Sequence, residues 1–217
     1  MSVVIHEVSH GFMAEHFGDN TARNAGRLTL NPIPHLDLFG SILLPAVLVL
    51  AHSPFLFGWA KPVPYNPNNL SNRKWGTIAV AAAGVITNFC LAIFFGIGAR
   101  LIPVAQEIKQ LIVAAFFSGN TMQLTSLLSL GIWSKIFLIF ALIAIINIML
   151  AIFNLIPIPP LDGSKILFSF LPESYFSFII AYEQYSLILL LVFIVFFSAY
   201  LYPILTFLFH LITGLAL

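Results

Sequence analysis

The residues with the clearest chemical potential are His6, Glu7 and His10, which stand together near the start of the chain. Side chains four residues apart share one face of a helix, so the two imidazoles can bind a single metal ion. A glutamate next to the first histidine can hold a water molecule and act as a general base. The alternative is a helix end that carries two histidines by chance. In a soluble protein the spacing alone would favour this alternative, so the choice depends on the composition of the chain.

The composition favours the metal site. Of the 217 residues, 60% are hydrophobic and only 8% are charged, with a formal net charge of +1. A soluble domain carries about 25% charged residues, so this chain is not disordered, not a coiled coil and not a nucleic-acid-binding protein. The lipid bilayer is its expected solvent, where ionisable side chains are costly and usually functional. The single cysteine, Cys90, excludes an internal disulfide and a cysteine-based zinc site.

Four apolar runs without Asp, Glu, Lys or Arg are long enough for membrane helices, which need about 20 residues. They are residues 38–60, 75–99, 136–161 and 184–217. Pro203 divides the last run into a span and a further helix, and residues 1–17 form another helix. The alternating residues 27–30 predict a short strand. We therefore expect one domain over residues 1–217. It is an all-α polytopic membrane protein, a bundle of about four to five membrane helices with a short membrane-associated strand region.

A third ligand is needed, because catalytic zinc sites use three protein ligands and leave one position for water. Asp162 is the only acid between Glu107 and Glu173, and it follows the apolar run that ends in a proline-rich break. Non-helical backbone at membrane depth must be buried in protein or line a wet cavity. Taken alone, a turn aspartate at the membrane surface is an equal alternative. Together with the two histidines, the ligand interpretation is the stronger one.

Several segments, in this order, resemble the site-2 protease family of intramembrane zinc metalloproteases. They are His6-Glu-Val-Ser-His-Gly11, Gly26-Arg-Leu-Thr-Leu-Asn-Pro32, Gly58-Trp-Ala-Lys-Pro-Val-Pro64 and Asn154-Leu-Ile-Pro-Ile-Pro-Pro-Leu-Asp-Gly163. The second and third segments are typical of a compact bacterial and archaeal branch that lacks PDZ and CBS domains. The first helix is shorter than the family's, so we expect a truncated N-terminal helix.

The resemblance implies a role for each site residue. His6, His10 and Asp162 would bind one Zn²⁺, and Glu7 would be the general base. Asn154 would act beside the metal on the substrate carbonyl or the oxyanion, with a helix–helix hydrogen bond as the alternative. Asn88 lies in a family-like motif in which Val85 replaces a proline, and we interpret it as a packing or cleft-lining residue.

The metal ligands also constrain the topology, because His10 and Asp162 must meet near one membrane face. This requires residues 38–60 to form a re-entrant segment that leaves and returns on the same side, with breaks at Pro45 and Ser53-Pro54. Six basic residues then gather on the active-site face, against three on the other. The positive-inside rule makes the first face cytoplasmic, so we expect a multi-pass protein of the cell membrane with its active site toward the cytoplasm.

The expected function is the hydrolysis of peptide bonds in transmembrane protein substrates. One alternative is a membrane metal carrier or channel, which would need polar residues along a path across the bilayer; residues 136–146 have none. Another alternative is a catalytically inactive, zinc-stabilised membrane scaffold, which the intact Glu7 disfavours. The expected partners are a transmembrane substrate and the lipid bilayer, with no nucleic acid. The sequence leaves the oligomeric state open.

Overall fold

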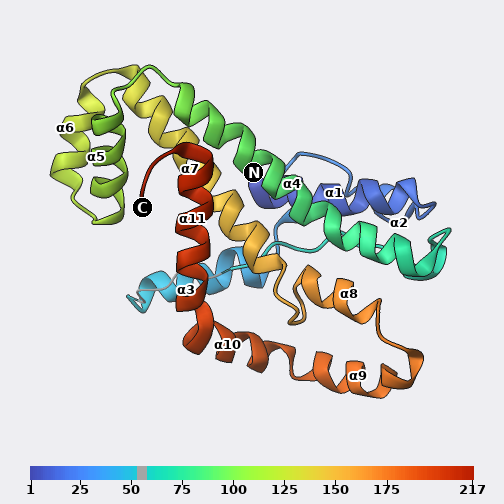
Figure 1. Ribbon diagram of the computed structural model, residues 1–217. Helices are drawn as coiled ribbons and strands as arrows, with labels where there is room; N and C mark the ends of the chain where they lie inside the picture. Colours follow the sequence, from blue (N-terminus) through green and yellow to red (C-terminus); the bar gives the residue numbers. More distant parts are fainter. Residues whose placement is uncertain (53–57) are drawn as a thin grey trace.

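The computed structural model describes residues 1–52 and 58–217, and every regular element in these two stretches is helical (Figure 1). The α-helices are α1 (Ser2–His16), α2 (Thr21–Asn24), α3 (Leu44–Leu50), α4 (Arg73–Leu101), α5 (Gln106–Phe117), α6 (Thr121–Ser129), α7 (Ile132–Asn154), α8 (Asp162–Phe168), α9 (Phe176–Gln184), α10 (Ser186–Phe197) and α11 (Tyr202–Thr213). Short 3-10 helices cover Ile33–His35, Pro67–Asn69, Glu173–Tyr175 and Ser198–Leu201, and a π-helix covers Leu38–Leu43.

Two helices, α4 and α7, are long and apolar enough to cross a membrane. Their 29 and 23 residues correspond to roughly 43 and 34 Å of helix, against a hydrocarbon core of about 30 Å. The side chain of Asn72 caps α4 by accepting a hydrogen bond from the Trp75 N–H at 3.0 Å. α7 ends at Asn154, just before the proline-rich segment that cannot continue it.

The prediction of four to five membrane helices was too high. The described residues contain two spans, or three if the segments Ser177–Gln184 and Ser186–Phe197, bent by 62°, form one broken span. Composition alone missed the breaks inside the apolar runs. In the described part of residues 38–60, the helix that begins at Leu38 ends at Leu50. α11 follows the 3-10 helix Ser198–Leu201 and has only 12 residues.

The two ends of the segment 38–60 are joined by hydrogen bonds. The Trp59 N–H donates to the Gly40 carbonyl at 3.2 Å, and the Ser41 hydroxyl donates to the Trp59 carbonyl at 2.7 Å. The two ends of the segment therefore lie side by side, as a re-entrant hairpin requires. The helix is not broken at Pro45 but runs on from Leu38 to Leu50, and the proline lies where the π-helix changes to α-helix. The second expected break, at Ser53-Pro54, lies outside the described residues.

The predicted strand at residues 27–30 is wrong, since this part of the described chain is an irregular loop. Its polar groups have partners other than a neighbouring strand, and the Arg27 N–H donates to the Ala22 carbonyl at 2.9 Å. The Arg27 guanidinium donates to the Lys61 carbonyl at 2.7 Å, and His35 Nε2 lies 3.0 Å from the Thr29 carbonyl. Pro32 and Pro34, which follow directly, also prevent extension of a ladder.

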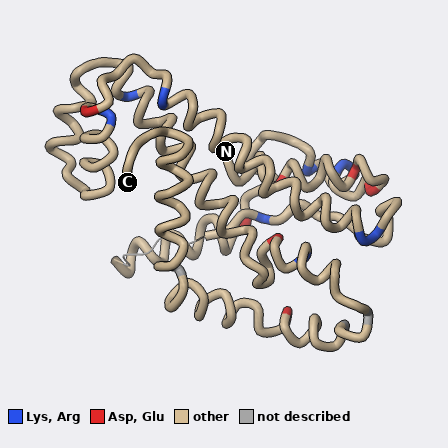
Figure 2. Tube along the Cα trace, viewed as in Figure 1, with Lys and Arg blue, Asp and Glu red and all other residues tan. Residues whose placement is uncertain are grey.

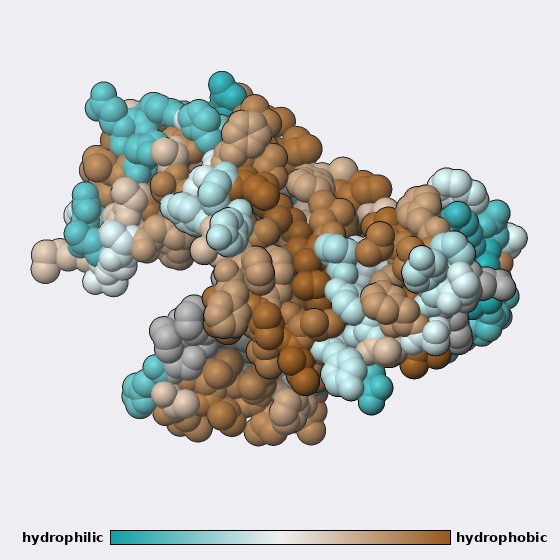
Figure 3. Space-filling view, turned by 60° about the horizontal axis from the view of Figure 1, so that its bottom comes forward, coloured by the Kyte–Doolittle hydropathy of each residue, from teal (hydrophilic) through white to brown (hydrophobic). Residues whose placement is uncertain are grey.

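The helices pack around α4, which has α1 on one side and α7 on the other, with α11 across both spans (Figure 1). The largest buried side chains in the core that α4, α5, α7 and α11 share are Phe137, Phe209, Ile112 and Ile148. Outside this core the surface is mostly hydrophobic, with polar side chains gathered toward two ends of the molecule (Figure 3). Phe94 is 69% exposed although it lies within the α4 span. Such a surface is suited to lipid.

Candidate metal centre

α1 carries His6 and His10 on the face that packs against α4, and both imidazoles are buried. Asp162 is also buried and begins α8, directly after the proline-rich turn that follows α7. The fold thus brings together the three side chains that were predicted as metal ligands, from two segments at opposite ends of the sequence.

The three ligand atoms form a nearly equilateral triangle. His6 Nε2 and His10 Nε2 are 3.0 Å apart, and each is 3.2 Å from Asp162 Oδ2. Zinc–nitrogen and zinc–oxygen bonds of about 2.0–2.1 Å at tetrahedral angles place ligand atoms about 3.3 Å from one another. Asp162 Oδ2 is fully buried and accepts no hydrogen bond from the described residues. A buried carboxylate oxygen without a donor is costly, so this donor set fits a zinc ion.

The outer nitrogens of both imidazoles have partners that fix ring orientation. His10 Nδ1 lies 2.6 Å from the Val80 carbonyl, which can only accept, so Nδ1 carries the proton and Nε2 is free to bind metal. His6 Nδ1 lies 3.1 Å from the side-chain amide nitrogen of Asn88, whose oxygen has no partner in the described chain. Rotating that amide by 180° puts the oxygen toward the imidazole N–H. Asn88 then holds His6 in the same metal-binding tautomer.

Gly84 allows α4 to approach the two histidines this closely. A Cβ atom at this position would lie 2.5 Å from His6 Cε1 and 2.6 Å from His10 Nε2. Such distances are shorter than van der Waals contact, so any larger residue would displace the imidazoles. Val80, Gly84 and Asn88 are spaced by four residues, which puts all three on one face of α4.

Glu7 is half-buried beside the two histidines. Three potential ligand atoms lie within 4.8 Å of one another: a carboxylate oxygen of Glu7, a ring nitrogen of His6 and a ring nitrogen of His10. Glu7 Oε2 accepts a hydrogen bond from the Val63 N–H at 2.8 Å. Because Val63 stands between Pro62 and Pro64, it offers the one backbone N–H in that short stretch. This contact anchors one carboxylate oxygen and leaves Oε1 available to a water molecule.

Lys165 pairs with the outer oxygen of Asp162, with 3.2 Å between Nζ and Oδ1. The two residues are three apart on α8, so they share a face of that helix. This pair directs Oδ2 of Asp162, and not Oδ1, toward the histidines.

Asn154, the last of the five predicted site residues, does not join the ligand triangle. Its side-chain amide donates to the Leu150 carbonyl of its own helix at 2.9 Å. It ends α7 shortly before the turn that leads to Asp162.

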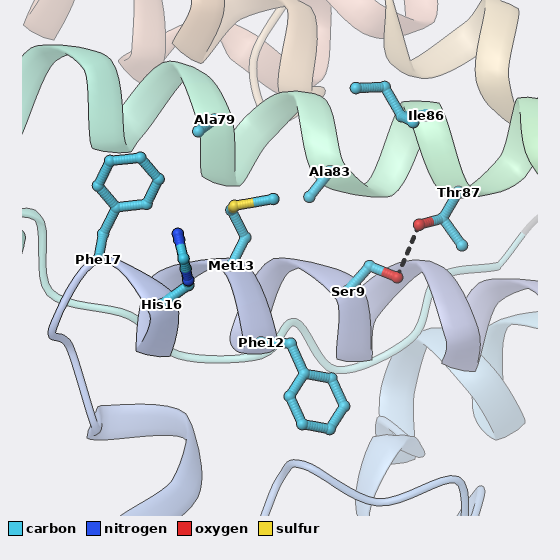
Figure 4. Close-up of a pocket in the computed structure, with 9 residues that line it drawn as sticks. All are labelled: Ser9, Phe12, Met13, His16, Phe17, Ala79, Ala83, Ile86 and Thr87. Carbon is cyan, nitrogen blue, oxygen red and sulfur yellow. Dashed lines mark hydrogen bonds between the residues drawn. The ribbon is translucent and has the colours of Figure 1, made fainter.

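A separate groove runs between α1 and α4 on another face of α1, with a volume of about 680 Å³ (Figure 4). Phe12, Met13 and His16 line it from α1, and Thr87 donates to the Ser9 hydroxyl at 2.9 Å across it. None of the three candidate ligands lines this groove, so it is distinct from the metal centre.

The sequence analysis missed several supporting groups. Asn88 was assigned to packing or to the lining of a cleft, and Lys165 was counted only as one of the basic residues of the active-site face. The Val80 carbonyl and the Val63 N–H were not considered. The spacing of Val80, Gly84 and Asn88 was a usable signal for one helix face. Backbone groups such as the Val63 N–H carry no such signal, because every residue type except proline has one.

A membrane protein whose HExxH helix meets a distant aspartate belongs to the class of membrane metalloproteases, and comparisons with known proteins identify the family. Residues 1–199 match the family model of peptidase family M50. "Putative zinc metalloprotease YwhC" of Bacillus subtilis (strain 168) is 36% identical over 192 residues, which cover 88% of this chain and 75% of that protein. "Putative zinc metalloprotease Rip2" of Mycolicibacterium smegmatis (strain ATCC 700084 / mc(2)155) is 26% identical over 163 residues, 75% of this chain and 51% of that protein. No solved structure matches.

The chain therefore belongs to peptidase family M50, the site-2 protease family, and it is a membrane zinc metalloprotease. This confirms the resemblance found in the sequence motifs, and with it the expectation of a zinc enzyme in a membrane.

Proposed function

We propose that this protein hydrolyses peptide bonds of membrane-spanning proteins within the bilayer, with His6, His10 and Asp162 as zinc ligands. The observation that carries the proposal is the triangle of ligand atoms, with sides of 3.0, 3.2 and 3.2 Å, beside the Glu7 carboxylate. These distances suit tetrahedral zinc and leave one position for water.

The depth of the site supports cleavage inside the membrane. The histidines contact α4 at Val80, Gly84 and Asn88. Gly84 is 11 residues from the start of α4 at Arg73, which is about 16 Å along the helix axis. A hydrocarbon core is about 30 Å thick, so the metal centre lies below the membrane surface and nearer to the Arg73 end.

The chain's own residues provide the acid–base chemistry. Bound zinc supplies a Lewis acid that lowers the pKa of a coordinated water to about 7 and polarises a carbonyl group. Oε1 of Glu7 accepts the proton of the attacking water, while a hydrogen bond from the Val63 N–H holds Oε2 in place. Glu7 then delivers this proton to the leaving amine. Asn154 reaches the oxyanion only after its amide leaves the Leu150 carbonyl, so we assign it a secondary role.

The orientation of the protein follows from its charges. Arg73 and Lys74 begin α4, whereas Arg100 lies in its last turn, so basic residues mark both ends of the span (Figure 2). The larger group of basic residues accompanies the Arg73 end. The positive-inside rule then puts the metal centre nearer the cytoplasmic face of the cell membrane.

The proposal is tested by Glu7→Gln, with Glu15→Gln as the matched control. Both glutamates lie on α1, but Glu15 is at its far end, paired with Arg23. We expect Glu7→Gln to lower cleavage of a transmembrane substrate at least about a thousandfold, within the range seen for essential catalytic groups, and to keep about one zinc per chain. Glu15→Gln should leave both values unchanged. Cleavage by Glu7→Gln at the wild-type rate would show that Glu7 is not the general base, whereas absence of cleavage by the zinc-loaded wild type would favour the carrier or scaffold alternatives.

A further inference from the structure

A second polar cavity, with a volume of about 710 Å³, lies at the start of α4, between its first turn and helices α8 and α9. Its charged lining consists of Arg73, Lys74 and Lys165 and a single acid, Glu183. The cavity therefore has an excess of positive charge and suits an anionic ligand.

Two of these cations are free to bind a ligand. Within the described part of the chain, Arg73 and Lys74 have no acidic partner, whereas Lys165 is shared with Asp162 at 3.2 Å. Lys74 is held by an aromatic ring, with Nζ 5.2 Å from the centroid of Phe170. Trp75 packs edge-on against the same ring at 6.4 Å. Lys74 is thus positioned by packing and not by an ion pair.

The location of the cavity favours lipid over a protein segment. Arg73 begins a candidate membrane span, so the cavity lies at the depth of the lipid headgroups. Trp75, which is 57% exposed, is of the type that anchors helices at this depth. Phe168, Leu171 and Ile179 add an apolar wall to the basic groups. A phospholipid has both parts, a charged phosphate and acyl chains. Basic pockets between membrane helices bind such headgroups.

We propose that this cavity binds the phosphate group of an anionic phospholipid such as phosphatidylglycerol, with Arg73 and Lys74 as the main contacts. Arginine gives paired hydrogen bonds to phosphate oxygens, and lysine adds a point charge. The proposal does not rest on the assigned catalytic residues, because no zinc ligand lines the cavity.

The test is native mass spectrometry of the full chain released from bilayers of equal parts phosphatidylglycerol and phosphatidylcholine. The wild type should retain one phosphatidylglycerol in preference to phosphatidylcholine. Arg73→Gln combined with Lys74→Gln should weaken this retention by about thirtyfold, since each basic residue near an anionic surface contributes about fivefold. The control, Arg100→Gln with Lys135→Gln, removes the same charge from the other part of the molecule and should retain the lipid. Zinc content reports that each variant is folded.

Three outcomes would overturn the proposal. Equal retention of both lipids by the wild type would do so without any variant, even if the double variant fails to fold. If the control variant lost phosphatidylglycerol to the same extent as the double variant, general charge attraction and not this cavity would explain the retention. A third arm adds inorganic phosphate at millimolar concentration to the detergent-purified protein. Binding of phosphate that depends on Arg73 and Lys74, without a preference between the lipids, would identify a free-phosphate site and exclude the lipid.

Discussion

His10 Nε2 lies 3.2 Å from Asp162 Oδ2, although one residue is in the first helix and the other follows the second membrane span. His6 Nε2 is at the same distance from this oxygen. The buried carboxylate oxygen has no hydrogen-bond donor among the described residues, which fits our proposal that it shares a metal ion with the two histidines. Three predictions test the metal centre, and a fourth tests the loop that covers one end of α1.

Replacing Asp162 with alanine should remove the metal site. The wild type should contain about one zinc per chain, as expected for a catalytic site with three protein ligands. The variant should bind zinc at least about a hundredfold more weakly, since loss of a direct ligand exceeds the 10–100-fold effect of outer groups. Metal analysis after dialysis against a zinc buffer measures the difference. Glu107→Ala, an exposed acid on α5, is the control, and equal zinc in both variants would contradict the assignment.

Asn88 is expected to act on zinc through His6. Asn88→Ala should weaken zinc binding by about 10–100-fold, the usual effect of losing the group that orients a ligand histidine. Asn88→Asp keeps an oxygen acceptor for the His6 N–H and should recover most of the affinity. Asn147 is an equally buried asparagine on α7 that donates to Ser2 at 2.8 Å. Asn147→Ala should lower thermal stability without changing zinc affinity, which separates orientation of a ligand from general packing.

Gly84→Ala should disrupt the metal centre by steric contact. The added Cβ would lie 2.5 Å from His6 Cε1, so the ring must move and the ligand triangle must open. We expect loss of most bound zinc in metal analysis. Gly96→Ala is a matched control, because its Cβ would lie 2.4 Å from the Ile212 side chain on α11. If both variants lose zinc to the same extent, the effect is destabilisation of α4 and not displacement of the histidines.

Asp19 should make the protein sensitive to acid. Its buried carboxylate accepts hydrogen bonds from the Thr21 and Asn66 backbones and from the Asn69 side chain, which ties the loop before α4 to the end of α1. Burial alone would raise the pKa of this carboxyl, but the hydrogen bonds lower it below the ordinary value of 3.8. The stabilisation is therefore complete well above pH 3.8 and is lost as the pH falls through the lower folded-state pKa.

The measurement is thermal unfolding of the wild type and Asp19→Asn across a pH series. At pH 7 the variant should be less stable by about 1–3 kcal/mol, the value of hydrogen bonds to a charged group. The difference should shrink as the pH is lowered below 4, because the wild-type carboxylate then takes up a proton. A constant difference at every pH would show that the charge of Asp19 is not the cause.

The candidate ligands were predictable because their signal is local. His6 and His10 share a helix face through the helical period alone, and Asp162 stood out as a rare acid after an apolar run. The membrane setting followed from composition. By contrast, the number of spans was overestimated, because a count of apolar residues ignores the end of α3 at Leu50 and the 3-10 helix at Ser198–Leu201. The strand at residues 27–30 failed because its backbone groups have other partners, the Ala22 carbonyl for the Arg27 N–H and the His35 ring for the Thr29 carbonyl.

The sequence by itself thus determined the class of protein, the ligand types and the segments that carry them, since these depend on residue identity and on spacing along single helices. Only the tertiary structure decided that Val80, Gly84 and Asn88 face the imidazoles and that the Val63 N–H anchors Glu7. It also returned residues 38–60 to their starting point and left Asn154 bonded to its own helix. These contacts join distant segments through packing and backbone groups, and neither leaves a periodic pattern in the sequence.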